Sequence, residues 1–273
     1  RSMKRIIGAF VLAALVLGVG GTRALAADAP RAERVFIFAV PALGYRDVSA
    51  TAMPALDAFL NRAAIADLST RVDGMDTSIA DGYATMAAGT RTVGARRDAG
   101  WAFDATEPFG SGTAGEEFER RTGQTSGTGL VYLAQPALRA ANAHKLFGTQ
   151  LGAVGDALAL AGSPAAVIAN ADPSLVPGSF ERTAETGLAD QAGRVPGGRL
   201  DGSLLRPDAA AAFGVQLDPA AVDAAFVKAF VPNSVVLVEA SDLWRAELAA
   251  PGASASATAQ HARMTSDALF ATL

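Results

Sequence analysis

Three short runs of apolar residues constrain the fold more than any other feature of the sequence. They cover Val35–Val40, Ala165–Ala169 and Ser234–Glu239. Runs of this length without polar alternation are typical of strands that are buried on both faces. Segments with helical spacing of apolar residues lie between them, so strands and helices alternate along the chain. We therefore predict an α/β fold, with a mostly parallel sheet and helices on both faces.

The rest of the chain fits this alternation in part. We expect a second strand over Ile65–Val72 and a short strand, or the lead into a helix, at Gly129–Leu133. Expected helices open at Met53-Pro54, at about Ile79, at Thr149, at Pro219 and near Gln260. Gly89 and Gly162 end two of them, as glycine commonly does after a helix. Two stretches lack periodicity: we predict a long loop or insertion at 90–128 and a small hairpin excursion at 182–205.

Composition excludes several classes of function. The 273 residues carry a formal charge of −4, so no basic excess exists to neutralise nucleic-acid phosphates. Cysteine is absent, which rules out disulfides, thiolate metal sites and a cysteine nucleophile. The two histidines, His144 and His261, are too few for a histidine-rich zinc site, and we expect both to be solvated or structural.

The first 27 residues have the pattern of a targeting segment. Lys4 and Arg5 precede an uncharged stretch from Ile6 to Gly21, and small residues follow at Ala24 and Ala26. This order is typical of a secretory signal peptide or of a retained N-terminal anchor. We expect an exported protein, extracellular or in the cell envelope, with residues 28–273 forming its folded domain. Membrane contact is expected only through an uncleaved N-terminal segment.

Candidate functional residues follow the predicted strands, because ligands of parallel sheets bind outside the carboxyl ends of the strands. Thr77, with Ser78 as the alternative, lies where a helix N-terminus favours an anion, although both are also ordinary helix caps. Asp242 follows the strand at 234–239 and is a candidate metal ligand, a cap or a surface residue. Asn170 and Asp172 follow another strand, in a stretch that equally forms a plain turn.

Four stretches together resemble the alkaline phosphatase superfamily, which contains phosphatases, sulfatases, nucleotide pyrophosphatases and phosphomutases. They are Val35–Asp47, Asp76–Thr92, Gly152–Asp172 and Val235–Arg245. The likeness is greatest to uncharacterised secreted or membrane-anchored actinobacterial members. It implies an alkaline-phosphatase-like α/β domain whose C-terminal part is missing, since the family's remaining metal motif normally follows later in the chain.

The resemblance implies roles for individual residues and shows where this sequence departs from the family pattern. It places the family nucleophile at Thr77, twelve residues before Gly89, and a metal ligand at Asp242. Pro41 stands where the first-strand aspartate would bind metal, and Arg245 lies where a histidine ligand is expected. Arg245 is then a candidate for clamping an anionic substrate. A divalent ion, zinc, manganese or calcium, is expected only if the protein is active.

These departures favour one function over two alternatives. The favoured hypothesis is a degenerate alkaline-phosphatase-like exported protein that lacks a complete metal site and binds an envelope ligand or partner. The second is a metal-dependent hydrolase of phosphoric or sulfuric esters with Thr77 as nucleophile. The third is a structural ectodomain without enzymatic activity. A phosphate or sulfate ester is the ligand expected from the resemblance.

Overall fold

The computed structural model describes residues 32–66, 72, 77–145 and 148–273 of the chain. The expected targeting segment at 1–27 and most of the expected strand at Ile65–Val72 lie outside the described residues. Arg34–Leu273 form one compact unit, whose fold is described below. Within the described residues, no helix is both long and apolar enough to span a membrane.

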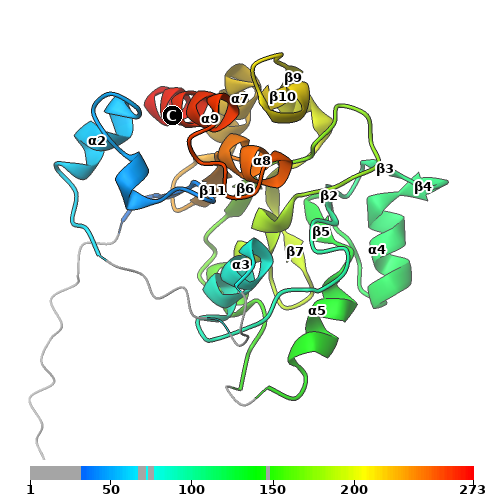
Figure 1. The fold of residues 1–273 in the computed structure, drawn as a ribbon. Helices are drawn as coiled ribbons and strands as arrows, with labels where there is room; N and C mark the ends of the chain where they lie inside the picture. The colour runs from blue at the N-terminus through cyan, green and yellow to red at the C-terminus, as the bar shows by residue number, and fades with distance from the viewer. Residues whose placement is uncertain (1–31, 67–71, 73–76, 146–147) are drawn as a thin grey trace, which may run out of the picture. The chain divides into compact units, whose positions relative to one another are not determined.

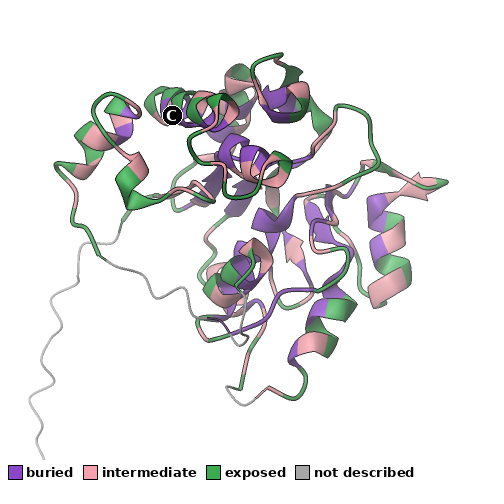
Figure 2. Ribbon diagram, viewed as in Figure 1, coloured by how far each residue is buried: buried purple, intermediate pink, exposed green. Residues whose placement is uncertain are grey.

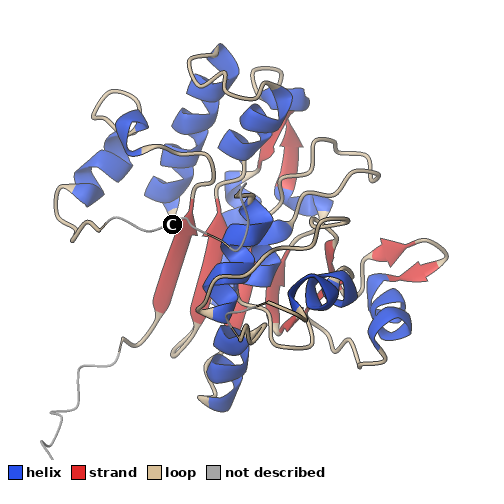
Figure 3. Ribbon diagram, turned by 60° about the horizontal axis from the view of Figure 1, so that its bottom comes forward, coloured by secondary structure: helices blue, strands red, loops and turns tan. Residues whose placement is uncertain are grey.

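A four-stranded parallel sheet forms the centre of this unit (Figures 1 and 3). Its strand order is β1-β11-β6-β8. The bounds are Val35–Ala39 for β1, Val235–Glu239 for β11, Ala165–Ile168 for β6 and Gly197–Arg199 for β8. β1 and β11 pair in register from Val35↔Val235 to Ala39↔Glu239. The α/β class and the parallel pairing expected from the three apolar runs are therefore confirmed.

Helices pack on both faces of this sheet. On one face, Val167 and Leu237 contact residues of α3, α5 and α6. On the other, Ile168 and Val238 pack with residues of α7 and α9. The bounds are Ile79–Ala88 for α3, Gln135–Asn142 for α5, Ala153–Leu160 for α6, Pro219–Ala229 for α7 and Ala257–Thr272 for α9. Figure 2 shows that buried residues are concentrated in the strands and on the inner sides of the helices.

Local sequence signals explain most of the helix boundaries. α2, Pro54–Leu60, has proline in its first turn, where the missing N–H needs no partner. α3 ends at Gly89, which adopts a left-handed conformation with φ of 64°. α6 starts at Ala153, later than the predicted Thr149, because Gly152 before it is also left-handed. The last helix begins at Ala257, and the short helix α8 covers Asp242–Ala249.

Of the two alternatives expected at 90–128, a long loop or an insertion, the long loop is wrong. The range contains β2 (Ala102–Asp104), the hairpin of β3 (Pro108–Phe109) and β4 (Gly112–Thr113), and helix α4 (Ala114–Thr122). With β5 (Leu130–Tyr132) and β7 (Arg194–Val195), β2 forms a second, antiparallel sheet. The strands are only two or three residues long, which is too short for a periodic signal.

The predicted hairpin excursion at 182–205 is also wrong. The range begins with a 3-10 turn at Thr183–Gly187 and then supplies β7 to the small sheet and β8 to the main sheet. A two-stranded hairpin follows later, between β9 (Leu205–Pro207) and β10 (Val215–Leu217). Three further 3-10 turns cover Tyr45–Asp47, Gly202–Leu204 and Ala212–Gly214.

Candidate functional site

The N-terminus of α3 is where the sequence placed a nucleophile. Ser78 is the N-cap of this helix, and its hydroxyl accepts a hydrogen bond from the Asp81 N–H at 3.1 Å. The Asp81 carboxylate in turn accepts from the Ser78 N–H and hydroxyl, each at 2.8 Å. This reciprocal capping box occupies the Ser78 hydroxyl. Thr77 precedes the cap and is exposed to solvent.

Asp81 changes the electrostatics at this helix end. Its side chain is completely buried, and its Oδ1 accepts a 2.6 Å hydrogen bond from the Gly94 N–H. Arg96 contacts the other oxygen at 3.4 Å. A carboxylate at the first turn already compensates the positive end of the helix dipole. An ester anion that approached Thr77 or Ser78 would therefore meet a negative charge beside the helix end.

Asp242 and Arg245, the predicted metal ligand and the predicted anion clamp, lie together in the first turns of α8. Oδ1 of Asp242 accepts from Nη2 of Arg245 at 2.5 Å and from the Leu217 N–H at 3.0 Å. Its Oδ2 accepts from the Thr265 hydroxyl at 2.7 Å. Arg245 also donates to the Asn170 carbonyl at 2.5 Å. The pair thus connects β10, α8, α9 and the loop after β6.

The Asp242–Arg245 ion pair is buried, and both of its side chains are bound within the protein. Arg245 is 0% exposed and Asp242 7% exposed, and both oxygens of Asp242 are hydrogen-bonded to protein groups. In the described ranges, no group of three or more His, Asp or Glu side chains is arranged to hold a metal ion. His261 pairs with Asp208 at 2.8 Å, away from this pair. Asp242 is therefore not part of a group of three or more such side chains within the part of the chain that the structure describes.

Glu239, which sequence analysis did not single out, is the centre of another buried group. The Tyr83 hydroxyl donates to its Oε2 and the Ser241 hydroxyl to its Oε1, both at 2.6 Å. Burial raises the pKa of Glu239, although these two hydrogen bonds and the charge of Arg245 act to lower it. Burial and the neighbouring carboxylate also raise the pKa of Tyr83 well above its usual value. The group joins α3 to the carboxyl end of β11.

Asn170 and Asp172 lie in the irregular loop after β6, and their side chains are bound to other groups of the protein. The Asn170 side chain donates to the Leu200 carbonyl at 2.6 Å and accepts from the Asp172 N–H at 2.9 Å. Asp172 forms a buried ion pair with Arg182 at 2.7 Å, and Arg182 also contacts Glu107 at 2.7 Å. Burial raises the pKa of Glu107 against the lowering effect of Arg182. This network holds the loop after β6 against the small sheet.

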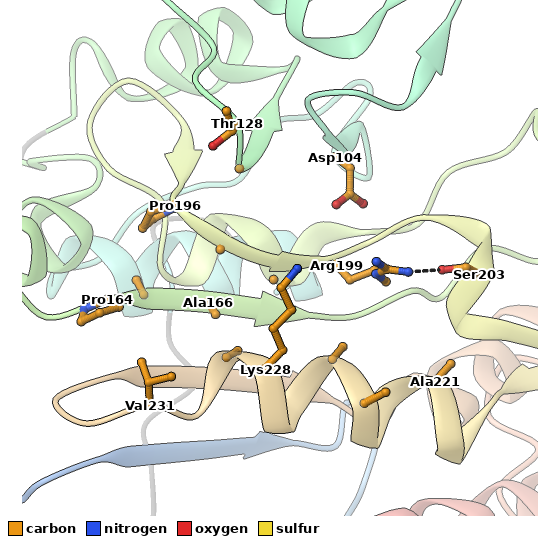
Figure 4. A pocket seen from close by; sticks show the side chains of 17 residues that line it. Asp104, Thr128, Pro164, Ala166, Pro196, Arg199, Ser203, Ala221, Lys228 and Val231 are labelled. Carbon is orange, nitrogen blue, oxygen red and sulfur yellow. Dashed lines mark hydrogen bonds between the residues drawn. The ribbon is translucent and has the colours of Figure 1, made fainter.

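An open cavity of about 700 Å³ lies beside β8 and α7 (Figure 4). Small side chains and backbone line most of it, including Gly197, Gly198, Ala221 and Ala225. Gly198 has a φ of +118°, and a Cβ there would lie 1.9 Å from the Val167 carbonyl oxygen. Only glycine therefore allows β8 to approach β6 in this way.

Three charged side chains line this cavity: Asp104, Arg199 and Lys228. Asp104 accepts hydrogen bonds from the N–H groups of Leu200 and Asp201, and burial raises its pKa. Arg199 is exposed and donates to the Ser203 hydroxyl at 2.9 Å. Figure 4 shows Lys228 reaching from α7 toward β8, and within the described residues its ammonium has no hydrogen-bond or ion-pair partner. Two accessible cations thus face a cavity of ligand size.

Comparisons with models of protein families, with curated proteins and with solved structures found no match to this chain.

Proposed function

We propose that this chain is a degenerate, exported member of the alkaline phosphatase superfamily that binds a ligand instead of hydrolysing it. The parallel sheet, with polar residues after the ends of β6 and β11, supports the proposal. The observation that carries it is the Asp242–Arg245 ion pair. The expected metal ligand and the expected anion clamp neutralise each other in a buried network, so neither is available to a substrate.

The cavity beside β8 is the place where we expect binding. Arg199 and Lys228 supply positive charge, and the backbone and small side chains around them leave room for the body of a ligand. Phosphate and sulfate groups are bound in proteins by such combinations of guanidinium and ammonium groups. The ligand class is therefore an anionic ester of the phosphate or sulfate type, which is also the class that the superfamily resemblance implies.

Two chromogenic esters test binding and hydrolysis together. The chain is titrated with p-nitrophenyl phosphate and p-nitrophenyl sulfate, binding is followed by calorimetry, and hydrolysis by release of nitrophenolate. We expect binding without release, and a loss of about tenfold or more in affinity in Arg199→Ala and Lys228→Ala. Lys145→Ala is the matched control because Lys145 does not line the cavity. Equal binding by all variants would contradict the assignment of the cavity.

The hydrolase remains the second candidate because Thr77 is exposed directly before the cap of α3. In that case, nitrophenolate is released by the wild-type chain in the presence of zinc, manganese or calcium, and release is lost in Thr77→Ala. Ser78→Ala separates the two hydroxyls, because Ser78 serves the helix as its cap. Release that depends on Thr77 would replace the binding proposal with the hydrolase.

A further inference from the structure

Asp104 places a carboxylate in the wall of the cavity beside β8, and one of its two oxygens has no partner among the described residues. Oδ2 accepts hydrogen bonds from the N–H groups of Leu200 and Asp201, at 3.0 and 3.1 Å. Oδ1 accepts none within the described part of the chain, and it is not sealed from solvent. A molecule in the cavity can therefore reach Oδ1 of Asp104.

The acidic side chains around Asp104 are engaged with other groups. Glu107 and Asp201 lie close enough to Asp104 to interact with it electrostatically. Both oxygens of Glu107 accept from Arg182, at 3.0 and 2.7 Å, and Asp201 accepts from the Ser203 N–H at 2.8 Å. Neither Glu107 nor Asp201 lines the cavity. Among the described residues, Asp104 is thus the one acidic side chain that lines it.

Two cations line the same cavity and are not paired with this carboxylate. Arg199 of β8 and Lys228 of α7 are both exposed, and no ion pair joins either of them to Asp104 within the described residues. Figure 4 shows Asp104 reaching toward β8 from one side and Lys228 reaching toward β8 from the other. The cavity therefore offers a ligand two positive groups and one negative group at separate positions.

The position of the carboxylate is fixed before a ligand arrives. Asp104 is the last residue of β2, and it pairs with Leu130 of β5 in the small sheet. Its two hydrogen bonds to the residues that follow β8 hold Oδ2 against the main sheet. A group that is already ordered costs little further conformational entropy when a ligand binds to it. Oδ1 of Asp104 is therefore a preorganised acceptor.

This arrangement of charges distinguishes between classes of anion. An ester that carries only negative charge meets the like charge of Asp104, whose partial burial makes the repulsion stronger than it is in water. A ligand that also carries an ammonium group gives Oδ1 a charge-assisted hydrogen bond. Thr128, which is exposed and lines the same cavity, adds a hydroxyl that can accept from such a group. Attraction of one ligand class and repulsion of the other together produce specificity.

We infer that the ligand of this cavity is a zwitterion, an ester of phosphate or sulfate that also carries an ammonium group. The inference rests on the proposed function, because it names the ligand class of the same cavity. The ester anion binds Arg199 and Lys228, and the ammonium group donates to Oδ1 of Asp104. The cavity, of about 700 Å³, has room for a carbon chain between the two charged groups.

Matched pairs of esters test this inference. Aminoalkyl phosphates and sulfates of increasing chain length are compared by calorimetry with the alkyl esters in which a methyl group replaces the ammonium group. The two members of a pair have nearly the same size and the same ester anion, so their affinities differ through the ammonium group. We expect the wild-type chain to bind at least one aminoalkyl ester about tenfold or more tightly than its alkyl counterpart.

Asp104→Asn removes the charge and keeps an oxygen that can accept from the N–H groups of Leu200 and Asp201. In this variant, we expect the two members of each pair to bind with similar affinity. The alkyl ester is expected to bind more tightly than it does to the wild-type chain, a gain that loss of structure would not produce. Asp223→Asn is the matched control and is expected to keep the wild-type preference, because Asp223 of α7 does not line the cavity.

The pH dependence of the preference is a second readout. Burial raises the pKa of Asp104, as does the charge of Asp201, whereas the two N–H groups and Arg199 act to lower it. As pH falls through this pKa, Asp104 becomes neutral, and the preference of the wild-type chain for the aminoalkyl ester is expected to decrease. The sulfate pairs suit this measurement, because their sulfate and ammonium groups keep their charges between mildly acidic and neutral pH. In Asp104→Asn, the ratio of the two affinities is expected to stay constant.

Two results would overturn the inference while the proposed function stands. One is equal binding of both members of every pair by the wild-type chain. The other is a preference for aminoalkyl esters that persists in Asp104→Asn when circular dichroism shows this variant to be folded, because the ammonium group would then bind elsewhere. Failure of the wild-type chain to bind any of these esters would overturn the proposed function, and the inference with it.

Discussion

At the scale of single residues, the buried charged groups decide how this fold is stabilised. Asp242 and Arg245 could be singled out from the sequence but their contact could not, and neither could the buried roles of Glu239, Arg182 and Glu185. Arg182 and Glu107, for example, lie 75 positions apart in the chain, and no local pattern connects them. The one available signal was a charged residue at the end of an otherwise apolar run, as at Glu239, since such a group needs a buried partner.

We expect the Asp242–Arg245 pair to contribute strongly to the stability of the folded chain. Removal of one member leaves the other charge buried and unpaired, so Asp242→Ala is expected to lower the free energy of unfolding by about 3–5 kcal/mol. Urea unfolding measures the change. Asp208→Ala is the control, because the Asp208–His261 pair is partly exposed and is expected to contribute less than about 1 kcal/mol. An Asp242→Ala variant with unchanged stability would show that the pair has no structural role.

Glu185 gives a prediction about pH. Both of its carboxylate oxygens are buried without a hydrogen-bond partner in the described part of the chain. Burial, and then the charge of Asp190, raise the pKa of Glu185 well above its ordinary value of 4.5. The folded state therefore holds the carboxyl proton of Glu185 more tightly than the unfolded state does. Stability is then lost as pH rises above about 4.5, by at most about 1.4 kcal/mol per pH unit.

Glu185→Gln removes this titration. We expect the variant to lose less stability than the wild-type chain between mildly acidic and neutral pH, as measured by urea unfolding at several pH values. Glu247→Gln, on the partly exposed side of α8, is the matched control for the same chemical substitution. Parallel curves for Glu185→Gln and the wild-type chain would mean that Glu185 does not titrate differently in the folded state.

At the scale of elements, the sequence predicted what continuous patterns encode. The strands at 35–40, 165–169 and 234–239 and the helix at 79–88 were found because apolar runs and caps are local signals. β8 was missed because Gly197-Gly198-Arg199 has no apolar pattern, and its place in the sheet depends on backbone contact with β6. α4 was missed because its sequence is mostly charged and its fully buried residues are only Ala114, Gly115 and Phe118.

The cap of α3 tests whether Ser78 is structural. Ser78→Ala removes one half of the capping box and is expected to lower stability by about 1 kcal/mol. Thr77→Ala, one position earlier, lies outside the capping box and is expected to have a smaller effect. Chemical denaturation of both variants measures the difference. The reverse order of effects would show that Thr77, and not Ser78, caps the helix.

Gly198 tests the geometry of the β8 edge. Gly198→Ala introduces a Cβ that would collide with the Val167 carbonyl. The φ of this position is also one that residues other than glycine rarely adopt. We expect a loss of about 3 kcal/mol or more in the free energy of unfolding. Gly202→Ala, where no atom lies within 4 Å of the added methyl group, is the matched control. Equal stability of the two variants would contradict the close approach of β8 to β6.

At the scale of the whole molecule, the α/β class could be predicted from the alternation of strands and helices. The burial of the residues expected to form the site could not. The parallel pairing of β11 with β6 brings the loops after these two strands to the same edge of the sheet. At that edge, the side chains of Asp242, Arg245 and Glu239 are buried and bound to other groups of the protein. The two accessible cations of the cavity, Arg199 and Lys228, lie beside β8 instead. Which polar residues face solvent depends on packing between distant segments, which a single sequence does not encode locally.

The metal content of the dialysed chain separates the proposed ligand-binding protein from a metal-dependent hydrolase. Elemental analysis for zinc, manganese and calcium after exhaustive dialysis measures whether the carboxyl edge of the sheet holds an ion. Because Asp242 is fully engaged with Arg245, Leu217 and Thr265, we predict far less than one equivalent of any of the three. One or two equivalents of metal ion that are lost in a folded Asp242→Asn variant would contradict the binding proposal and support the metal-dependent hydrolase.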